Sequence, residues 1–165
     1  MPISSVGRTN SFGERGVTLL ELLVVVAIIG LIVGISMPSV AAGLDAVRMV
    51  SATDSVASFL NSAVNRAQRR QEPVELIVDF KGNQFSAYSN DPSYSRELKL
   101  PEGVSIDSVT PGEENEQREP RRILILPGGS VPGIGIQLSS QRGTRRLVRL
   151  DPMTGYPRVE SVKPS

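Results

Sequence analysis

The chain contains no cysteine, no histidine and no tryptophan among its 165 residues, and only 4% of them are aromatic. The lack of cysteine excludes a disulfide framework, a thiolate zinc site and a cysteine nucleophile. The lack of histidine removes the commonest general base and the commonest metal ligand. We therefore expect no enzyme, no catalytic residues, no cofactor and no metal site. The soluble part must build its core mainly from Val, Ile and Leu.

An excess of either charge is also lacking, because 18 Lys and Arg face 17 Asp and Glu. This balance argues against nucleic-acid binding by the chain as a whole. The distribution is uneven, with eleven acids and four bases in residues 72–119 and eight bases and two acids in residues 121–165. Three interpretations remain open: solvated strand faces, attraction between the two halves of the region, or a face turned toward a partner.

One long hydrophobic run is present, VTLLELLVVVAIIGLIVGISM at residues 17–37, and its single charge is Glu21. A helix of this length spans about 30 Å, the hydrocarbon thickness of a bilayer. Arg8 and Arg15 precede the run, whereas the next arginine is Arg48. The positive-inside rule therefore predicts a single-pass protein with residues 1–16 in the cytoplasm.

Glu21 decides between the kinds of membrane segment. A cleaved secretory signal has a shorter apolar core and ends in small residues. A plain signal anchor has this length but leaves the acid unexplained, since a central charge costs about 2.5–3.5 kcal/mol on insertion scales. An acid near the helix N-terminus, favoured by the helix dipole, is the purely structural interpretation.

The stretch from Gly16 through TLLE to Pro38 resembles the class III signal of type IV pilins and type II secretion pseudopilins. This resemblance implies cleavage after Gly16 by the prepilin peptidase and N-methylation of Val17 by the same enzyme. It also implies that Glu21 pairs with the N-terminal amine of a neighbouring subunit and sets the register of the filament. Such pairing removes both charges from lipid.

Beyond the run, Pro38 predicts a kink and the pattern becomes amphipathic up to residue 71. The predicted core stripe is Val40, Leu44, Val47, Val56, Phe59, Leu60, Ala63, Val64 and Ala67. Arg66, Arg69 and Arg70 gather in the last turn, where cations suit the helix dipole. Pro73 ends the helix.

Short strands follow, and they make residues 72–165 a β-rich domain. The predicted strands are 74–80, 84–89, 96–100, 104–109, 122–126, 134–138, 145–150 and 156–162. Residues 110–120 are predicted to be a flexible exposed loop. The domains are thus a leader at 1–16, a transmembrane helix at 17–37, an amphipathic helix at 38–71 and the β domain. The predicted fold class is α+β, with a long N-terminal helix packed on an antiparallel sheet domain.

The C-terminal half resembles the GspH/FimT group of minor pseudopilins and minor pilins. The resemblance rests on Pro127-Gly128-Gly129-Ser130 after one strand and on Thr154-Gly155 before the last. It implies a minor pseudopilin of the H type in a type II secretion system, in the bacterial inner membrane with a periplasmic C-terminal domain. The implied partners are the prepilin peptidase, major and minor pseudopilins and the inner-membrane secretion platform, and no nucleic acid.

Two alternatives remain. A FimT-like type IV minor pilin would bind DNA or another ligand through Arg142, Arg145, Arg146 and Arg149, with Arg145 and Arg149 on one strand face and Arg146 on the other. An unprocessed, membrane-anchored binding domain is the other alternative. Asp151 with loop oxygens is a calcium candidate, but no acids cluster around it.

Overall fold

The computed structural model describes residues 17–111, 119–129 and 131–162, and at 38 and 39 it describes the backbone alone. The leader, Gly16, Ser130 and residues 112–118 of the predicted loop lie outside this range. The chain divides into two compact units, one ending at Val40 and the other beginning at Ala41. One helix, α1 (Leu19–Arg70), has residues in both.

In the first unit every residue from Val17 to Met37 is exposed. Leu19 is 81% and Leu20 71% exposed. The segment is the one helical stretch in the described chain that is long and apolar enough to cross a membrane. The helix is continuous through Pro38, and the predicted kink there stays a prediction.

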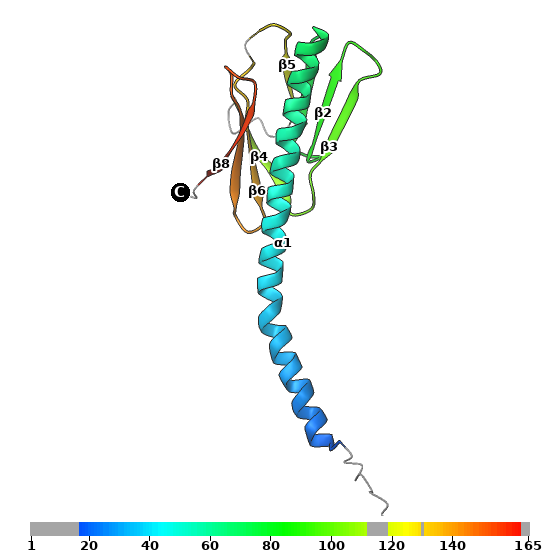
Figure 1. Ribbon diagram of the computed structural model, residues 1–165, viewed down its shortest axis with the longest axis vertical. Helices are drawn as coiled ribbons and strands as arrows, with labels where there is room; N and C mark the ends of the chain where they lie inside the picture. Colours follow the sequence, from blue (N-terminus) through cyan, green and yellow to red (C-terminus); the bar gives the residue numbers. More distant parts are fainter. Residues whose placement is uncertain (1–16, 112–118, 130, 163–165) are drawn as a thin grey trace, which may run out of the picture. The chain divides into compact units, whose positions relative to one another are not determined.

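Eight strands follow α1 in the described part of the second unit. They are β1 (Val74–Asp79), β2 (Gln84–Ser89), β3 (Ser95–Lys99), β4 (Val104–Thr110), β5 (Arg121–Ile125), β6 (Gly135–Ser140), β7 (Arg145–Leu150) and β8 (Pro157–Val162). They form two four-stranded sheets, in the orders β3-β2-β1-β5 and β4-β6-β7-β8. Every pairing is antiparallel. The fold is therefore the expected α+β arrangement of a long helix against antiparallel sheets (Figure 1).

The core forms where the helix meets both sheets. The buried helix positions recur every three or four residues, as one face of a helix requires: Met49, Ala52, Val56, Phe59, Leu60, Ala63, Val64 and Ala67. From the sheets, alternate strand residues such as Leu76, Phe85, Leu138 and Val148 complete the same cluster. The helix and both sheets therefore contribute to one buried cluster.

The predicted core stripe was wrong at its N-terminal end. Val40 is 67%, Leu44 49% and Val47 65% exposed. At 3.6 residues per turn, Val40 and Val47 lie roughly opposite Met49 on the helix. The helix thus carries two apolar stripes, and only the one that begins at Met49 faces the sheets.

The ends of the elements follow local chemistry. α1 ends at Arg70, and Gln71 adopts a φ of 54°, the left-handed conformation common just after a helix. In the β1–β2 turn, the Asp79 carboxylate accepts hydrogen bonds from the Lys81 and Gly82 amides, each at 3.0 Å. The Asn83 side chain then bonds Val104 and Ile106 and so ties this hairpin to the other sheet.

Candidate processing and assembly site

The start of α1 is built by Thr18. Its carbonyl accepts the Leu22 amide at 3.2 Å, and its hydroxyl accepts the Glu21 amide, also at 3.2 Å. Thr18 is therefore the N-cap residue, and Glu21 occupies the third helical position. The spacing Thr-x-x-Glu is that of a capping box, a signal that marks the helix start in the sequence and that hydrophobic periodicity alone does not show.

The cap places Val17 outside the helix. Val17 precedes the first helical residue by two positions, and it is 67% exposed. Its backbone is therefore not engaged in the helical hydrogen-bond ladder. Gly16, the other residue of the predicted scissile bond, lies outside the described residues.

Glu21 projects from the first turn, where a carboxylate interacts favourably with the helix dipole. It is exposed, and no ion pair joins it to any residue between 17 and 111, 119 and 129 or 131 and 162. Its immediate surroundings are the exposed apolar side chains of the run. Among the described residues, Glu21 is thus an unpaired carboxylate at the start of an uncovered apolar helix.

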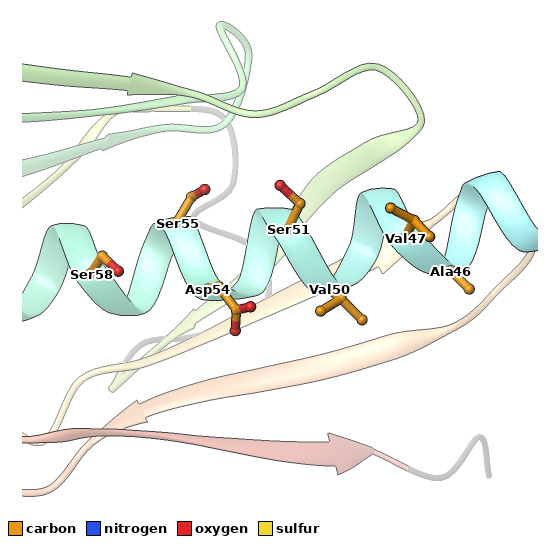
Figure 2. Close-up of a pocket in the computed structure, with 7 residues that line it drawn as sticks. All are labelled: Ala46, Val47, Val50, Ser51, Asp54, Ser55 and Ser58. Carbon is orange, nitrogen blue, oxygen red and sulfur yellow. The ribbon is translucent and has the colours of Figure 1, made fainter.

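A second uncovered helix face lies in the folded unit. A groove of about 650 Å³ runs along α1, and it is lined by Ala46, Val47, Val50, Ser51, Asp54, Ser55 and Ser58. Figure 2 shows Ser51 and Ser55 on one side of the helix and Val50 and Asp54 on the other. The groove lies on the face of α1 that is directed away from the sheets. Its apolar side chains are flanked by serine and aspartate side chains.

The four arginines proposed for DNA binding do not form one free surface. Arg142 Nε lies 2.7 Å from Asp45 Oδ2 on α1, and Arg145 Nε lies 3.7 Å from Asp107 Oδ2. Arg146 is half-buried on the core-facing side of β7, as strand alternation predicts, whereas Arg145 and Arg149 are exposed. Only Arg149 is both exposed and without an ion pair to the rest of the described chain.

The Asp151 carboxylate makes its hydrogen bonds within the turn between β7 and β8. Its Oδ1 accepts the amides of Met153 at 2.9 Å and Thr154 at 3.3 Å, and its Oδ2 pairs with Arg158 at 3.4 Å. The two amides, with the Arg158 charge, lower the pKa of Asp151. Both oxygens are engaged, and no group of three potential acidic or sulfur ligands occurs in the described parts of the chain.

The turn at Thr154-Gly155 has the expected form. Gly155 adopts a φ of 71°, and its amide donates to the Asp151 carbonyl at 2.8 Å. After β5, Gly128 likewise adopts a positive φ of 67°. Both glycines thus occupy backbone conformations that other residues rarely adopt.

Comparison with known proteins identifies the N-terminal region. A family described as the prokaryotic N-terminal methylation motif matches residues 12–37. Neither a curated protein nor a solved structure matches the chain. The matched segment contains the capped helix start and Glu21, and it continues as the long helix that packs on antiparallel sheets. Proteins of this kind are generally structural rather than enzymatic, and their motif implies processing by a prepilin peptidase and assembly with pilins. The chain is a type IV pilin-like protein with the N-terminal methylation motif of pilus and pseudopilus subunits.

Proposed function

We propose that the chain is a minor pseudopilin of the H type, a structural subunit of the periplasmic pseudopilus in a type II secretion system. The observation that carries the proposal is the lone Glu21 carboxylate in the first turn of an uncovered apolar helix, within the methylation motif. The two glycine turns at Gly128 and Gly155 support assignment to the GspH/FimT group.

Processing would supply the missing partner of Glu21. Cleavage after Gly16 would free an amine at Val17, which lies before the helix and is exposed. Methylation leaves that amine positively charged. In a bundle of such helices the amine of one subunit and Glu21 of another would attract strongly, because the surrounding dielectric is low. The pairing would fix the stagger between subunits.

The rest of the proposed mechanism is architectural. The apolar segment 17–37 would anchor the chain in the inner membrane, with the leader in the cytoplasm and the β domain in the periplasm. Partner subunits would cover the groove from Ala46 to Ser58. The assembled filament, held on the inner-membrane platform, would push secreted proteins outward.

Intact mass of the membrane-extracted protein, produced with its own prepilin peptidase, tests the processing step. We expect loss of residues 1–16 and gain of one methyl group on Val17. A Gly16→Asp variant, in which cleavage is blocked, serves as control and keeps the full-length mass. A full-length mass for the unaltered chain would contradict the proposal and favour the unprocessed anchored domain.

The assignment to secretion needs a separate test. Deletion of the gene should abolish export of the secreted proteins and leave surface pili in place, and restored export should require Glu21, with Glu21→Gln inactive. Loss of pili or of DNA uptake, with secretion intact, would favour the FimT-like minor pilin instead.

A further inference from the structure

A basic cleft lies between the end of α1 and the start of β3. It has a volume of about 570 Å³ and is lined by Ser62, Asn65, Arg66, Arg69, Arg70, Ser93, Tyr94, Ser95 and Arg96. Four of these nine side chains are arginines, and none is acidic. The cleft lies wholly within the folded unit that begins at Ala41, and it shares no lining residue with the groove of Figure 2.

Arg66 is the arginine of the cleft whose side chain is held in place by contacts with neighbouring residues. Its Nη2 lies 2.8 Å from Asp91 and 3.5 Å from Glu72, and its guanidinium lies 4.7 Å from the centre of the Tyr94 ring. The side chain is only 17% exposed. The Arg66 Nε, the Glu72 Oε2 and the Tyr94 hydroxyl are buried without a hydrogen-bond partner. Unpaired buried polar atoms are rare in folded proteins and call for a specific explanation.

The other three arginines are the free charges. Arg69, Arg70 and Arg96 are exposed, and none forms an ion pair with a residue that the structure describes. The helix dipole explains Arg69 and Arg70 in the last turn. It does not explain Arg96, which is paired in register with the buried Ala87 and so lies on the core-facing side of β3.

The helix α1 and the strand β3 therefore bring positively charged arginines to the same cleft. Like charges in one cleft repel one another, and an anion bound between them would relieve that repulsion. Guanidinium groups suit planar carboxylates, which they bind through paired hydrogen bonds. The serine hydroxyls and the Asn65 amide that line the cleft can bond the backbone of a peptide.

We propose that this cleft binds a carboxylate-rich segment of a partner polypeptide. Single-stranded nucleic acids bind on exposed aromatic platforms, whereas the one aromatic ring here already has Arg66 against its face. The proposal goes beyond the secretion role and does not depend on cleavage or methylation, since every residue concerned lies outside the motif.

The test uses the full-length protein in neutral-detergent micelles and a fluorescently labelled hexaglutamate peptide, with hexaglutamine as the uncharged control. We expect hexaglutamate binding that weakens with salt and no hexaglutamine binding. The triple variant Arg69→Gln, Arg70→Gln and Arg96→Gln should bind roughly tenfold more weakly or worse, since three charge-assisted contacts are lost.

A matched triple variant removes the same net charge elsewhere: Arg122→Gln, Arg149→Gln and Arg158→Gln. It should bind hexaglutamate within about twofold of the unaltered chain, because these exposed arginines lie outside the cleft. Thermal midpoints report the folding of each variant. Should the cleft triple unfold, Arg96→Gln alone carries the test, with an expected loss of roughly threefold.

Three results would overturn the proposal. The first is no binding of hexaglutamate. The second is equal weakening in both triple variants, which would show general charge attraction. The third is a preference for a single-stranded oligonucleotide that the cleft variant loses, which would make the ligand a nucleic acid.

Discussion

At the scale of single residues, Thr18 has a role separate from processing. Its hydroxyl accepts the Glu21 amide and so fixes where α1 begins. In the proposed filament this cap would also fix the position of the Glu21 backbone relative to the new N-terminus at Val17. The start of the helix and the position of Glu21 in the assembly motif therefore both depend on the Thr18 side chain.

Thr18→Ala is expected to weaken the first turn of α1 by about 0.5–2 kcal/mol, because the Glu21 amide loses its acceptor. Hydrogen exchange of the full chain in micelles measures this as a fall in Glu21 amide protection of roughly 2- to 30-fold. Thr18→Ser keeps a hydroxyl and should retain most of the protection. Equal protection in the Ala and Ser variants would show that the hydroxyl does not cap the helix.

Asp91 is predicted to titrate far below its ordinary range. The Ser93 hydroxyl and amide donate to its carboxylate, and with Arg66 they lower the pKa of Asp91 from 3.8 to about 2. Because the folded-state pKa is depressed, the stability that Asp91 contributes is present above about pH 4 and is lost as the pH falls toward 2.

Carboxyl carbon NMR of Asp91 during an acid titration measures this pKa directly. In a Ser93→Ala variant the hydroxyl donor, the largest cause of the shift, is lost, and the pKa should move back toward 3.8. An ordinary pKa for Asp91 in the unaltered chain would mean that the contacts with Ser93 and Arg66 do not persist in solution.

At the scale of elements, the turn between β7 and β8 is packed onto the helix through Gly155. A side-chain Cβ there would lie 3.3 Å from both Val131 and Val64, and the φ of 71° disfavours other residues. Gly143, in the β6–β7 turn, has a φ of 83° but nothing within 4 Å of such a Cβ. Substitution of Gly143 would therefore impose backbone strain alone, whereas substitution of Gly155 would add steric crowding.

Gly143→Ala is expected to lower the free energy of unfolding by about 1 kcal/mol from backbone strain alone. Gly155→Ala carries the same strain and forces Val64 and Val131 to move, which adds about 1–3 kcal/mol. Denaturant unfolding of the two variants in micelles measures the difference. Equal losses would show that the turn yields without disturbing the helix.

The bounds of some strands could be predicted because turn-forming residues lie between them. β2 and β7 were predicted at their observed bounds, since each is a short run between Gly-, Asn- or Asp-containing turns. The hairpin of β1 and β2 could be predicted from the short turn at residues 81–83, and it is confirmed. Pairing between strands far apart in the chain could not be predicted: β1 also pairs with β5 through Leu76 and Ile123. The helix face was also ambiguous, because the stripe at Val40 and Val47 has the same period as the true core stripe.

The candidate sites likewise fall into two groups: those that a contiguous sequence motif predicts, and those that form only when distant segments fold together. Val17 and Glu21 were predicted from a contiguous motif, whose family match at residues 12–37 supports it. The basic cleft was missed, because Arg96 joins Arg66 only after β3 has folded beside the end of α1. The ion pair between Arg142 and Asp45 was missed for the same reason: it joins a turn to a helix about a hundred positions earlier.

At the scale of the whole molecule, the exposed run 17–37 has to find lipid or other helices. An Ile28→Arg substitution places a charge near its centre and should reduce membrane integration, at a cost of about 2.5–3.5 kcal/mol on insertion scales. Extraction with alkaline carbonate measures the integrated fraction. Val40→Arg, beyond the run, is the matched control and should leave integration unchanged, so equal extraction of both variants would contradict a membrane span at 17–37.

The single core shared by α1 and both sheets has a consequence for the order of events during synthesis. Met49 and Ala52 enter the same cluster as Val148 and Leu150, so the last core strand arrives about a hundred residues after the helix. Contacts this distant in sequence form late. The domain therefore stays unfolded until nearly the whole chain has emerged. A nascent chain halted before β7 would remain a substrate for chaperones and proteases.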